Sequence, residues 1–254
     1  MTQNIYDDPA FFEGYSQLGR SVQGLAGAAE WPVLQAMLPP LRGKRVVDLG
    51  CGYGWFCRWA AEQGAAQVIG LDVSEKMLER AVATTAHTAV SYARADLEQL
   101  VLVEGGFDLV YSSLTLHYIV NLAGLFAAAY RALAPGGKLV FSIEHPIYMA
   151  PTHPGWVFDA QGRRTWPIDS YQIEGPRSTN WLAEGVIKQH RTIGTLLNLL
   201  IAGGFTICHV EEWGPSAEEL LARPELEEER DRPDRKSTRL NSSHKTVSRM
   251  PSSA

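Results

Sequence analysis

A glycine-rich turn behind an aspartate is the feature of this sequence with the clearest chemical meaning. Residues 48–54 read Asp-Leu-Gly-Cys-Gly-Tyr-Gly, so glycine recurs at every second position from Gly50 to Gly54. Glycine adopts positive φ angles and lets a ligand approach the main chain closely. The apolar run at 45–49 and the helical pattern at 54–63 predict a strand, a turn and a helix, a unit typical of nucleotide sites.

Two further aspartates follow the next predicted strands. Asp72 closes a strand at 67–72, and Asp96 follows a strand at 90–94. A carboxylate at a strand end can accept hydrogen bonds from both hydroxyls of a ribose, and another can accept one from the amino group of adenine. Each aspartate also has a structural interpretation, Asp72 as a helix or turn cap and Asp96 as a surface turn residue.

The glycine spacing argues against a nicotinamide dinucleotide. The G-x-G-x-x-G fingerprint needs a third glycine so that helix and strand can pack closely, and here Trp55 occupies that place. An NAD-dependent oxidoreductase is therefore the functional class that this glycine turn supports least.

The elements that would position these residues alternate along the chain. Strands are predicted at 45–49, 67–72, 90–94, 107–112, 138–143 and 205–210, and helices at 54–63, 75–83, 122–133 and 192–202. Short apolar strands alternating with helices are typical of a parallel sheet that is covered on both faces. We predict an α/β fold, a three-layer sandwich with a mostly parallel central sheet.

Five motifs in the expected order resemble class I S-adenosylmethionine-dependent methyltransferases, in particular the type 11 group of small-molecule enzymes. They are 47–54, Asp72, 95–97, 107–111 and 133–139. The resemblance covers residues 45–144 motif by motif and 191–210 more loosely. It implies the Rossmann-like class I fold, S-adenosylmethionine as the cofactor, and methyl transfer to a small-molecule acceptor. A sensor or scaffold that binds the cofactor without transferring its methyl group is the alternative.

The resemblance also assigns residues to the cofactor. They are Asp48, Gly50, Cys51, Gly52, Gly54, Asp72, Val73, Met77, Asp96 and Leu97. Asp72 would hold the ribose and Asp96 the adenine amino group, with the Leu97 amide beside the ring. Asp48 would orient the ammonium of the methionine part, or serve as a buried acid that supports the turn. Val73 and Met77 are interpreted as contacts to the adenine face or as core residues.

Methyl transfer from a sulfonium needs alignment and exclusion of water more than it needs acid or base groups. A base is required only when the nucleophile must lose a proton. The candidates near the ends of the fourth and fifth strands are His117 and His145, with Tyr118 and Glu144 beside them. Because a lone histidine is more often structural, both histidines carry that second interpretation too.

Residues 146–185 interrupt the alternation. This stretch is rich in proline and glycine and contains Trp156, Trp166 and Trp181. Long loops inside compact domains are commonly functional, so we expect an acceptor-binding insertion that also covers the site. A purely structural cover over the sheet is the other interpretation.

The remaining segments complete the predicted domain organisation. They are an N-terminal helical cap at 1–44, whose early aromatics pack helices or cover a ligand, a methyltransferase domain at 45–214, a helical segment at 215–234 and a tail at 235–254. The tail is polar, serine-rich and without aromatics, which predicts disorder. It resembles translated adapter sequence, so we interpret it as non-native and expect the last strand of the sheet to be missing.

Composition narrows the function classes. Five of the 23 basic residues lie in the acid-free tail, so the rest of the chain holds 18 basic residues against 28 acidic ones. Nucleic-acid binders need a basic surface, so we expect a small-molecule partner and no nucleic acid. No apolar run suggests a membrane span, no signal peptide is evident, and an odd count of three cysteines favours a reduced, cytoplasmic protein.

Overall fold

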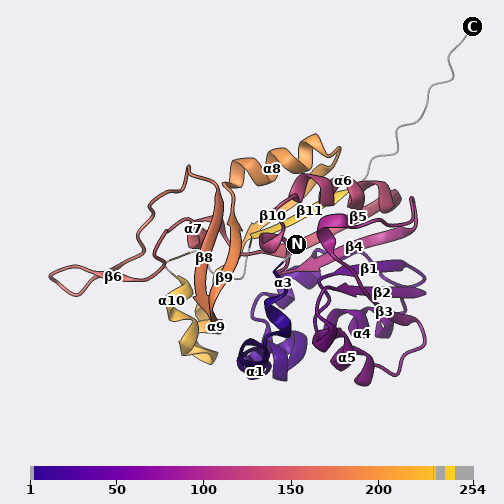
Figure 1. Cartoon of the computed structure of the whole chain (residues 1–254), viewed down its shortest axis with the longest axis horizontal. Helices are drawn as coiled ribbons and strands as arrows, with labels where there is room; N and C mark the ends of the chain where they lie inside the picture. Colours follow the sequence, from indigo (N-terminus) through magenta and orange to yellow (C-terminus); the bar gives the residue numbers. More distant parts are fainter. Residues whose placement is uncertain (1–2, 231, 233–237, 244–254) are drawn as a thin grey trace, which may run out of the picture.

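A seven-stranded sheet forms the centre of the molecule (Figure 1). The structure is a computed structural model that describes residues 3–230, 232 and 238–243. The strand order is β10-β11-β5-β4-β1-β2-β3, in which β3, β2, β1, β4 and β5 pair in parallel. The strands are β1 (Arg45–Leu49), β2 (Gln67–Asp72), β3 (Val90–Arg94), β4 (Phe107–Ser113), β5 (Leu133–Ile143), β10 (Thr206–Glu212) and β11 (Thr238–Ser243).

Helices cover both faces of this sheet. These helices are α3 (Trp31–Ala36), α4 (Trp55–Glu62), α5 (Glu75–Ala83), α6 (Leu122–Ala132) and α8 (Ile193–Ala202). Alternate residues of the strands belong to two separate cores: Val46 shares one with Phe56 of α4, and Val47 shares the other with Phe126 of α6. Side chains alternate across a strand, so one run of apolar residues fills both cores. The predicted three-layer α/β sandwich is confirmed.

Polar side chains begin these helices where the sequence predicts. Ser74 Oγ accepts a hydrogen bond from the Met77 N–H at 3.1 Å, which starts α5 at the predicted residue. Asn121 and Thr192 cap α6 and α8 in the same way. Because such caps satisfy main-chain donors that the helix leaves unpaired, they fix where each helix enters the sheet layer.

The stretch at 146–185 is not an irregular loop, and this part of the prediction is wrong. It contains α7 (Pro146–Met149), the small hairpin β6 (Val157–Phe158) and β7 (Arg164–Thr165), β8 (Gly175–Trp181) and the start of β9 (Ala183–His190). Strands β8 and β9 form an antiparallel hairpin. The turn between them holds Leu182 at a φ of +60°. In Figure 1 this hairpin lies beside the sheet, while the β6 end projects away from the body.

The N-terminal cap consists of short helical segments. These are η1 (Ile5–Asp7), α1 (Pro9–Ser16), α2 (Gly19–Val22) and η2 (Gly24–Gly27), followed by α3. The cap and the β8–β9 hairpin meet in a cluster of aromatic rings. Phe11 and Tyr15 of α1 both lie edge-on to Trp181, with ring centroids 5.5 and 6.3 Å apart.

The C-terminal part corrects a second prediction, that the last strand is missing. Strand β11 pairs antiparallel with both β5 and β10 and fills the position between them. Strand pairing uses main-chain groups, so a strand between two neighbours can form without the side-chain alternation that the sequence lacks here. The rest of the predicted tail, 235–237 and 244–254, lies outside the described residues.

Two further observations concern helices. Segment 215–230 is helical but divided at Pro224 into α9 (Ala217–Ala222), η5 (Pro224–Leu226) and α10 (Glu227–Arg230). In the part of the chain that the structure describes, no helix has the length and apolar character needed to cross a membrane.

Candidate functional site

A cavity of about 490 Å³ opens where β1, β2 and β4 end. Nine of the ten residues predicted to bind the cofactor line it, the exception being Gly54. The other walls come from the N-terminal cap, from η4 (Leu116–Tyr118), from Glu144 after β5, from Trp181 of the hairpin and from α9 to α10. Parallel strands end at one edge of a sheet, which is why residues far apart in the sequence meet here.

The glycine turn forms one wall of the cavity. Gly50 has a φ of +81° and Gly52 a φ of +51°, a region that favours glycine. A Cβ at Gly50 would lie 2.1 Å from Thr115 Oγ1, whereas one at Gly52 would meet no atom within 4 Å. Gly50 therefore permits close packing of the turn, and Gly52 leaves its cavity side open to a ligand.

Gly54 has a different function from the other two glycines. It starts α4 with a φ of +72°, and a Cβ there would lie 2.1 Å from the hydroxyl of Tyr92. The structure therefore gives Gly54 a packing role behind the cavity, not a place in its lining.

Asp72 lies at the end of β2, facing the turn. Its Oδ2 accepts a hydrogen bond from the Gly52 N–H at 2.8 Å, and its Oδ1 accepts one from the Ser74 N–H at 3.0 Å. Burial raises the pKa of this carboxyl above its ordinary value, against the lowering effect of these hydrogen bonds. Each carboxylate oxygen can accept a second hydrogen bond, so Asp72 can still receive two hydroxyls.

Asp48 is fully buried below the turn. Burial raises its pKa to about 8, while a hydrogen bond from Cys57 Sγ, 3.4 Å from Oδ2, lowers it. Desolvation penalises the charged carboxylate, so in the free protein this acid changes its charge near neutral pH. A cationic group in the cavity would favour the ionised form.

Asp96 and Leu97 lie where β3 leads into η3 (Leu97–Gln99). Asp96 Oδ1 accepts a hydrogen bond from the Glu98 N–H at 3.0 Å and thereby caps this turn. Leu97 and Met77 are buried, Val73 is half-buried, and all three line the cavity together with Asp96. Apolar side chains with a carboxylate beside them suit a purine base.

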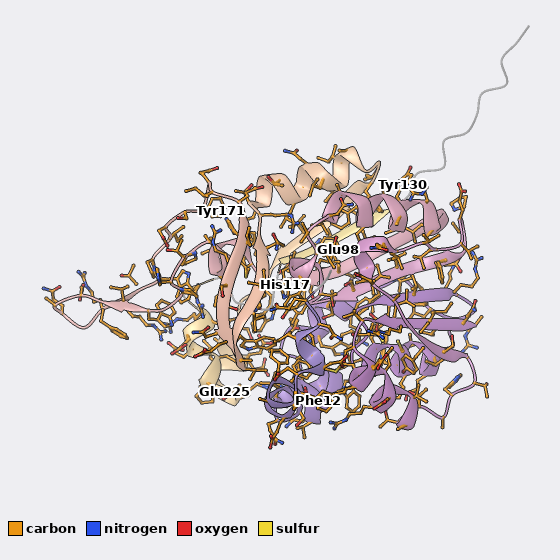
Figure 2. All side chains as sticks on the ribbon, viewed as in Figure 1. Phe12, Glu98, His117, Tyr130, Tyr171 and Glu225 are labelled. Carbon is orange, nitrogen blue, oxygen red and sulfur yellow. The ribbon has the colours of Figure 1, made fainter. Side chains whose placement is uncertain are left out.

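His117 is 2% exposed and lines the cavity. Figure 2 labels it near the centre of the molecule. Its Nδ1 accepts a hydrogen bond from the Glu144 N–H at 3.4 Å. Burial, together with the nearby Lys188 ammonium, holds the pKa of His117 well below its ordinary value. The imidazole is therefore neutral.

The second histidine candidate does not reach the cavity. His145 Nε2 lies 2.6 Å from Glu212 Oε1, and its Nδ1 accepts a hydrogen bond from the Ile147 N–H at the start of α7. Both ring nitrogens are thus engaged in joining β5 to β10 and in capping a helix. This placement gives no support to a catalytic role for His145.

Two charged residues that the sequence did not predict, Arg20 and Glu30, also belong to the cavity. Arg20 Nη2 lies 3.4 Å from Glu30 Oε1, and both residues line the cavity. Glu30 is 1% exposed, and its Oε2 has no hydrogen-bond partner among the described residues. The electrostatic surroundings of the Tyr111 hydroxyl include Arg20, Glu30 and Asp48, so these charges gather at one end of the cavity.

The side chains of Asp7 and Gln3 hold the N-terminal cap over the cavity. Asp7 Oδ1 accepts hydrogen bonds from Ser74 Oγ at 2.6 Å and from the Lys76 N–H at 3.2 Å, at the start of α5. The Gln3 side chain bonds to both Gly185 O and the Ile187 N–H of the hairpin at 2.9 Å. The early aromatics extend this cover, since the Tyr6 hydroxyl donates to the Tyr118 hydroxyl at 3.2 Å.

Comparison with known proteins identifies the family. Residues 47–141 match the model of a methyltransferase domain family. The structure of an S-adenosylmethionine dependent methyltransferase from Mesorhizobium loti is 60% identical, with a TM-score of 0.83 over 87% of this chain and 100% of that one. A curated protein of Haemophilus influenzae is 35% identical in an alignment of 239 residues that covers 88% of this chain and 94% of the relative.

A more distant relative carries a specific name. The malonyl-[acyl-carrier protein] O-methyltransferase of Erwinia billingiae is 38% identical over 102 residues, 40% of this chain and 39% of the relative. Together these matches show that the chain belongs to the S-adenosylmethionine-dependent methyltransferases of the type 11 group. The parallel sheet is accordingly that of the class I methyltransferase fold.

The cavity fits the cofactor that this family uses. An open glycine turn, a carboxylate at the end of β2 and a buried, unpartnered oxygen of Glu30 match a ligand with ribose and amino-acid ends. Among the described residues no group of histidine, cysteine and acidic side chains is arranged to hold a metal ion.

Proposed function

We propose that this cavity binds S-adenosylmethionine and presents its methyl group to a small-molecule acceptor. One observation carries the proposal: a single cavity runs from Asp72 and Gly52 to the ring of His117 and the hydroxyl-bearing Tyr118. A cofactor pocket that continues into a closed aromatic space leaves room for a compact acceptor next to the methyl group.

The roles of the cofactor-binding residues follow from their positions. Asp72 accepts the ribose hydroxyls, Asp96 accepts the adenine amino group, and Leu97 and Met77 pack against the base. Gly52 lets the methionine part lie against the main chain. The ribose assignment uses the hydrogen-bond capacity that Asp72 retains beside its main-chain partners, and the adenine assignment uses the position of Asp96 in the cavity wall.

The amino-acid end of the cofactor meets complementary charges. Arg20 supplies a cation for its carboxylate, while Glu30 and Asp48 supply acceptors for its ammonium. Charge-assisted hydrogen bonds of this kind are stronger than neutral ones and orient both ends of a zwitterion. Arg20 and Glu30 already form an ion pair, so both charges are in place before the ligand enters.

When bound, S-adenosylmethionine would supply a methyl group on a sulfonium, whose sulfur becomes a neutral thioether and so needs no acid to help it leave. The chain's own residues align the acceptor and exclude water. Alignment alone can contribute about 7–11 kcal/mol to lowering the barrier. The cap and the hairpin, joined through Gln3, form the cover that excludes water from the reacting atoms.

The Erwinia relative is named for methyl transfer to an oxygen of a malonyl group. That name supports a small carboxylic group as one kind of acceptor. Its match spans 39% of that relative and 40% of this chain.

The test separates transfer from binding alone. Calorimetry with S-adenosylhomocysteine and with NADH gives the cofactor, and tritium transfer from labelled S-adenosylmethionine into a small-molecule extract gives the activity. We expect binding of S-adenosylhomocysteine, none of NADH, and label in the extract. Tight binding without transfer to any fraction would favour the scaffold alternative, and binding of NADH alone would overturn the proposal.

A further inference from the structure

The acceptor end of the cavity is bordered by several groups that can donate hydrogen bonds and by one acid that forms an ion pair with a buried lysine. It is bordered by His117, Tyr118, Tyr6, Glu144 and Trp181. The hydrogen bonds that these residues can still make, and their protonation states, determine which kind of nucleophile can react in the cavity.

The hydrogen bonds assign the tautomer of His117. Because Nδ1 accepts the Glu144 N–H, the single proton of the neutral ring is on Nε2. Nε2 has no hydrogen-bond partner among the described residues, although the side chain is 98% buried and lines the cavity. Nε2 is not one of the fully buried atoms that lack a partner, so it keeps access to the cavity, where this N–H can donate to a ligand oxygen.

The tyrosines near His117 are also donors. Burial raises the pKa of Tyr6 and of Tyr118 far above the ordinary value of tyrosine, so both keep their protons. The Tyr6 hydroxyl donates to the Tyr118 hydroxyl, whose own proton then points elsewhere. Neither phenol can serve as a base at neutral pH.

Glu144 is the acid at this end of the cavity, and it is committed to another group. Its Oε1 lies 2.6 Å from Lys188 Nζ, and Lys188 is 1% exposed. The ammonium lies over the ring of Trp181, 4.7 Å from its centroid. The formal charges of the ammonium and the carboxylate cancel, so the pair adds no net charge beside an anion in the cavity.

We propose that the acceptor is a small carboxylate, ionised before it enters, and that His117 Nε2–H holds one of its oxygens while the other is methylated. This inference rests on the proposed transfer function. The carboxylate oxygen forms the bond to the methyl carbon as the carbon–sulfur bond breaks and its electron pair stays on sulfur. The anion and the sulfonium become a neutral ester and a neutral thioether, and no proton moves.

The first test identifies the chemical class of the methylated product and does not require that the acceptor be known. The protein is incubated with tritiated S-adenosylmethionine and a bacterial small-molecule extract, and the labelled products are treated with mild alkali. A methyl ester releases labelled methanol, which is the expected result. Label that resists alkali would overturn the carboxylate while leaving methyl transfer in place. No label, in protein that binds S-adenosylhomocysteine, would overturn both.

The second test asks whether His117 donates a hydrogen bond or takes up a proton. His117→Gln keeps an N–H near Nε2 but cannot act as a base, and His117→Leu removes both functions. With the labelled fraction as acceptor, His117→Leu should lower kcat/KM about 10- to 100-fold, the loss typical of a hydrogen bond to a charged group. His117→Gln should retain activity within about threefold, because its amide supplies the same kind of donor.

Matched controls make this comparison decisive. His153 is exposed and outside the cavity, so His153→Gln and His153→Leu should leave kcat/KM unchanged. All four variants should bind S-adenosylhomocysteine as the parent protein does, which shows that the cofactor site is intact. If His117→Gln is as inactive as His117→Leu, with a loss of about 100- to 10,000-fold, His117 is a general base and the proposal is wrong.

Discussion

Lys188 Nζ lies 2.6 Å from Glu144 Oε1, and this buried ion pair joins strand β9 of the hairpin to the end of β5. The two side chains are 2% and 8% exposed. One partner comes from the sheet edge that forms the cavity and the other from the segment that covers it. The position of the cover is therefore fixed by an interaction that has little access to water.

Breaking this pair from one side should destabilise the protein strongly. Lys188→Met removes the ammonium that balances Glu144, and such one-sided changes in buried pairs cost about 3–5 kcal/mol. Urea unfolding followed by circular dichroism measures the change. Arg163→Met, in an exposed pair with Asp159, is the control and should change the free energy of unfolding by less than about 1 kcal/mol. Adding Glu144→Leu to Lys188→Met should restore part of the loss; no recovery would contradict this explanation.

Asp72→Ala tests the ribose assignment. Loss of the carboxylate should weaken S-adenosylhomocysteine binding by about 1.5–3 kcal/mol, the range for hydrogen bonds to a charged group. Isothermal titration calorimetry gives the affinity, and a thermal melt confirms that the variant is folded. Asp159→Ala, at an exposed acid outside the cavity, should bind as the parent does. An unchanged affinity in folded Asp72→Ala protein would disprove the assignment.

Gly52→Ala separates the conformational role of the turn from its contact with the ligand. The new methyl group would enter the open side of the turn and should weaken S-adenosylhomocysteine binding at least about tenfold, a typical cost of overpacking. Gly136→Ala is the matched control: this glycine also has a positive φ, +78°, and no atom within 4 Å of a new Cβ. Both variants should lose about 1–2 kcal/mol of stability for the strained φ, but only Gly52→Ala should lose affinity. Equal binding by the two would contradict the contact.

The buried acid Asp48 should make stability depend on pH with a definite sign. Folding raises its pKa to about 8, mainly through burial. The group's contribution to stability is therefore complete below its ordinary value near 4 and is lost as the pH rises through about 8. Urea unfolding of the parent and of Asp48→Asn should show the parent losing stability relative to the variant between pH 5 and pH 9. Parallel curves would mean that Asp48 is already ionised in the folded protein.

Truncation tests the contribution of β11. A chain ending after residue 243 keeps the strand, whereas one ending after residue 234 leaves main-chain groups of β5 and β10 without their partner strand. We expect the shorter chain to melt several degrees lower, since a loss of about 1–2 kcal/mol shifts the Tm of a large domain by roughly 2–8 °C. Equal melting temperatures would show that the pairing adds nothing to stability.

The part of the fold that the sequence predicts well is the part with strong local signals. Strands β1, β2 and β3 and helix α5 have the predicted boundaries, because apolar runs, Ser74 and the glycine turns mark their ends. The β8–β9 hairpin was missed since its strands carry polar residues on both sides and its one buried cation, Lys188, depends on a distant acid. The sequence does not predict strand β11, because what defines this strand is main-chain pairing with β5 and β10 and not a pattern of its own residues.

Some residues of the candidate site can likewise be predicted from local sequence patterns, and others cannot. The glycine turn, Asp72 and Asp96 follow predicted strands, so their common edge could be deduced from the order of the elements. Arg20 and Glu30 lie in a glycine- and alanine-rich stretch without periodicity, and no local pattern marks them as part of the cavity. Of the two histidines, the sequence could not tell which ring would be engaged by Glu212, a residue 67 positions away.

The side chain of Gln3 bridges to the hairpin through two hydrogen bonds, to Gly185 O and from the Ile187 N–H. These two hydrogen bonds form a clasp at the cavity wall between segments about 180 positions apart in the sequence. We expect the release of spent cofactor and product to require this clasp to open, which would place a common upper limit on turnover. A turnover rate that stays constant across acceptors of different reactivity would be the kinetic signature of this clasp.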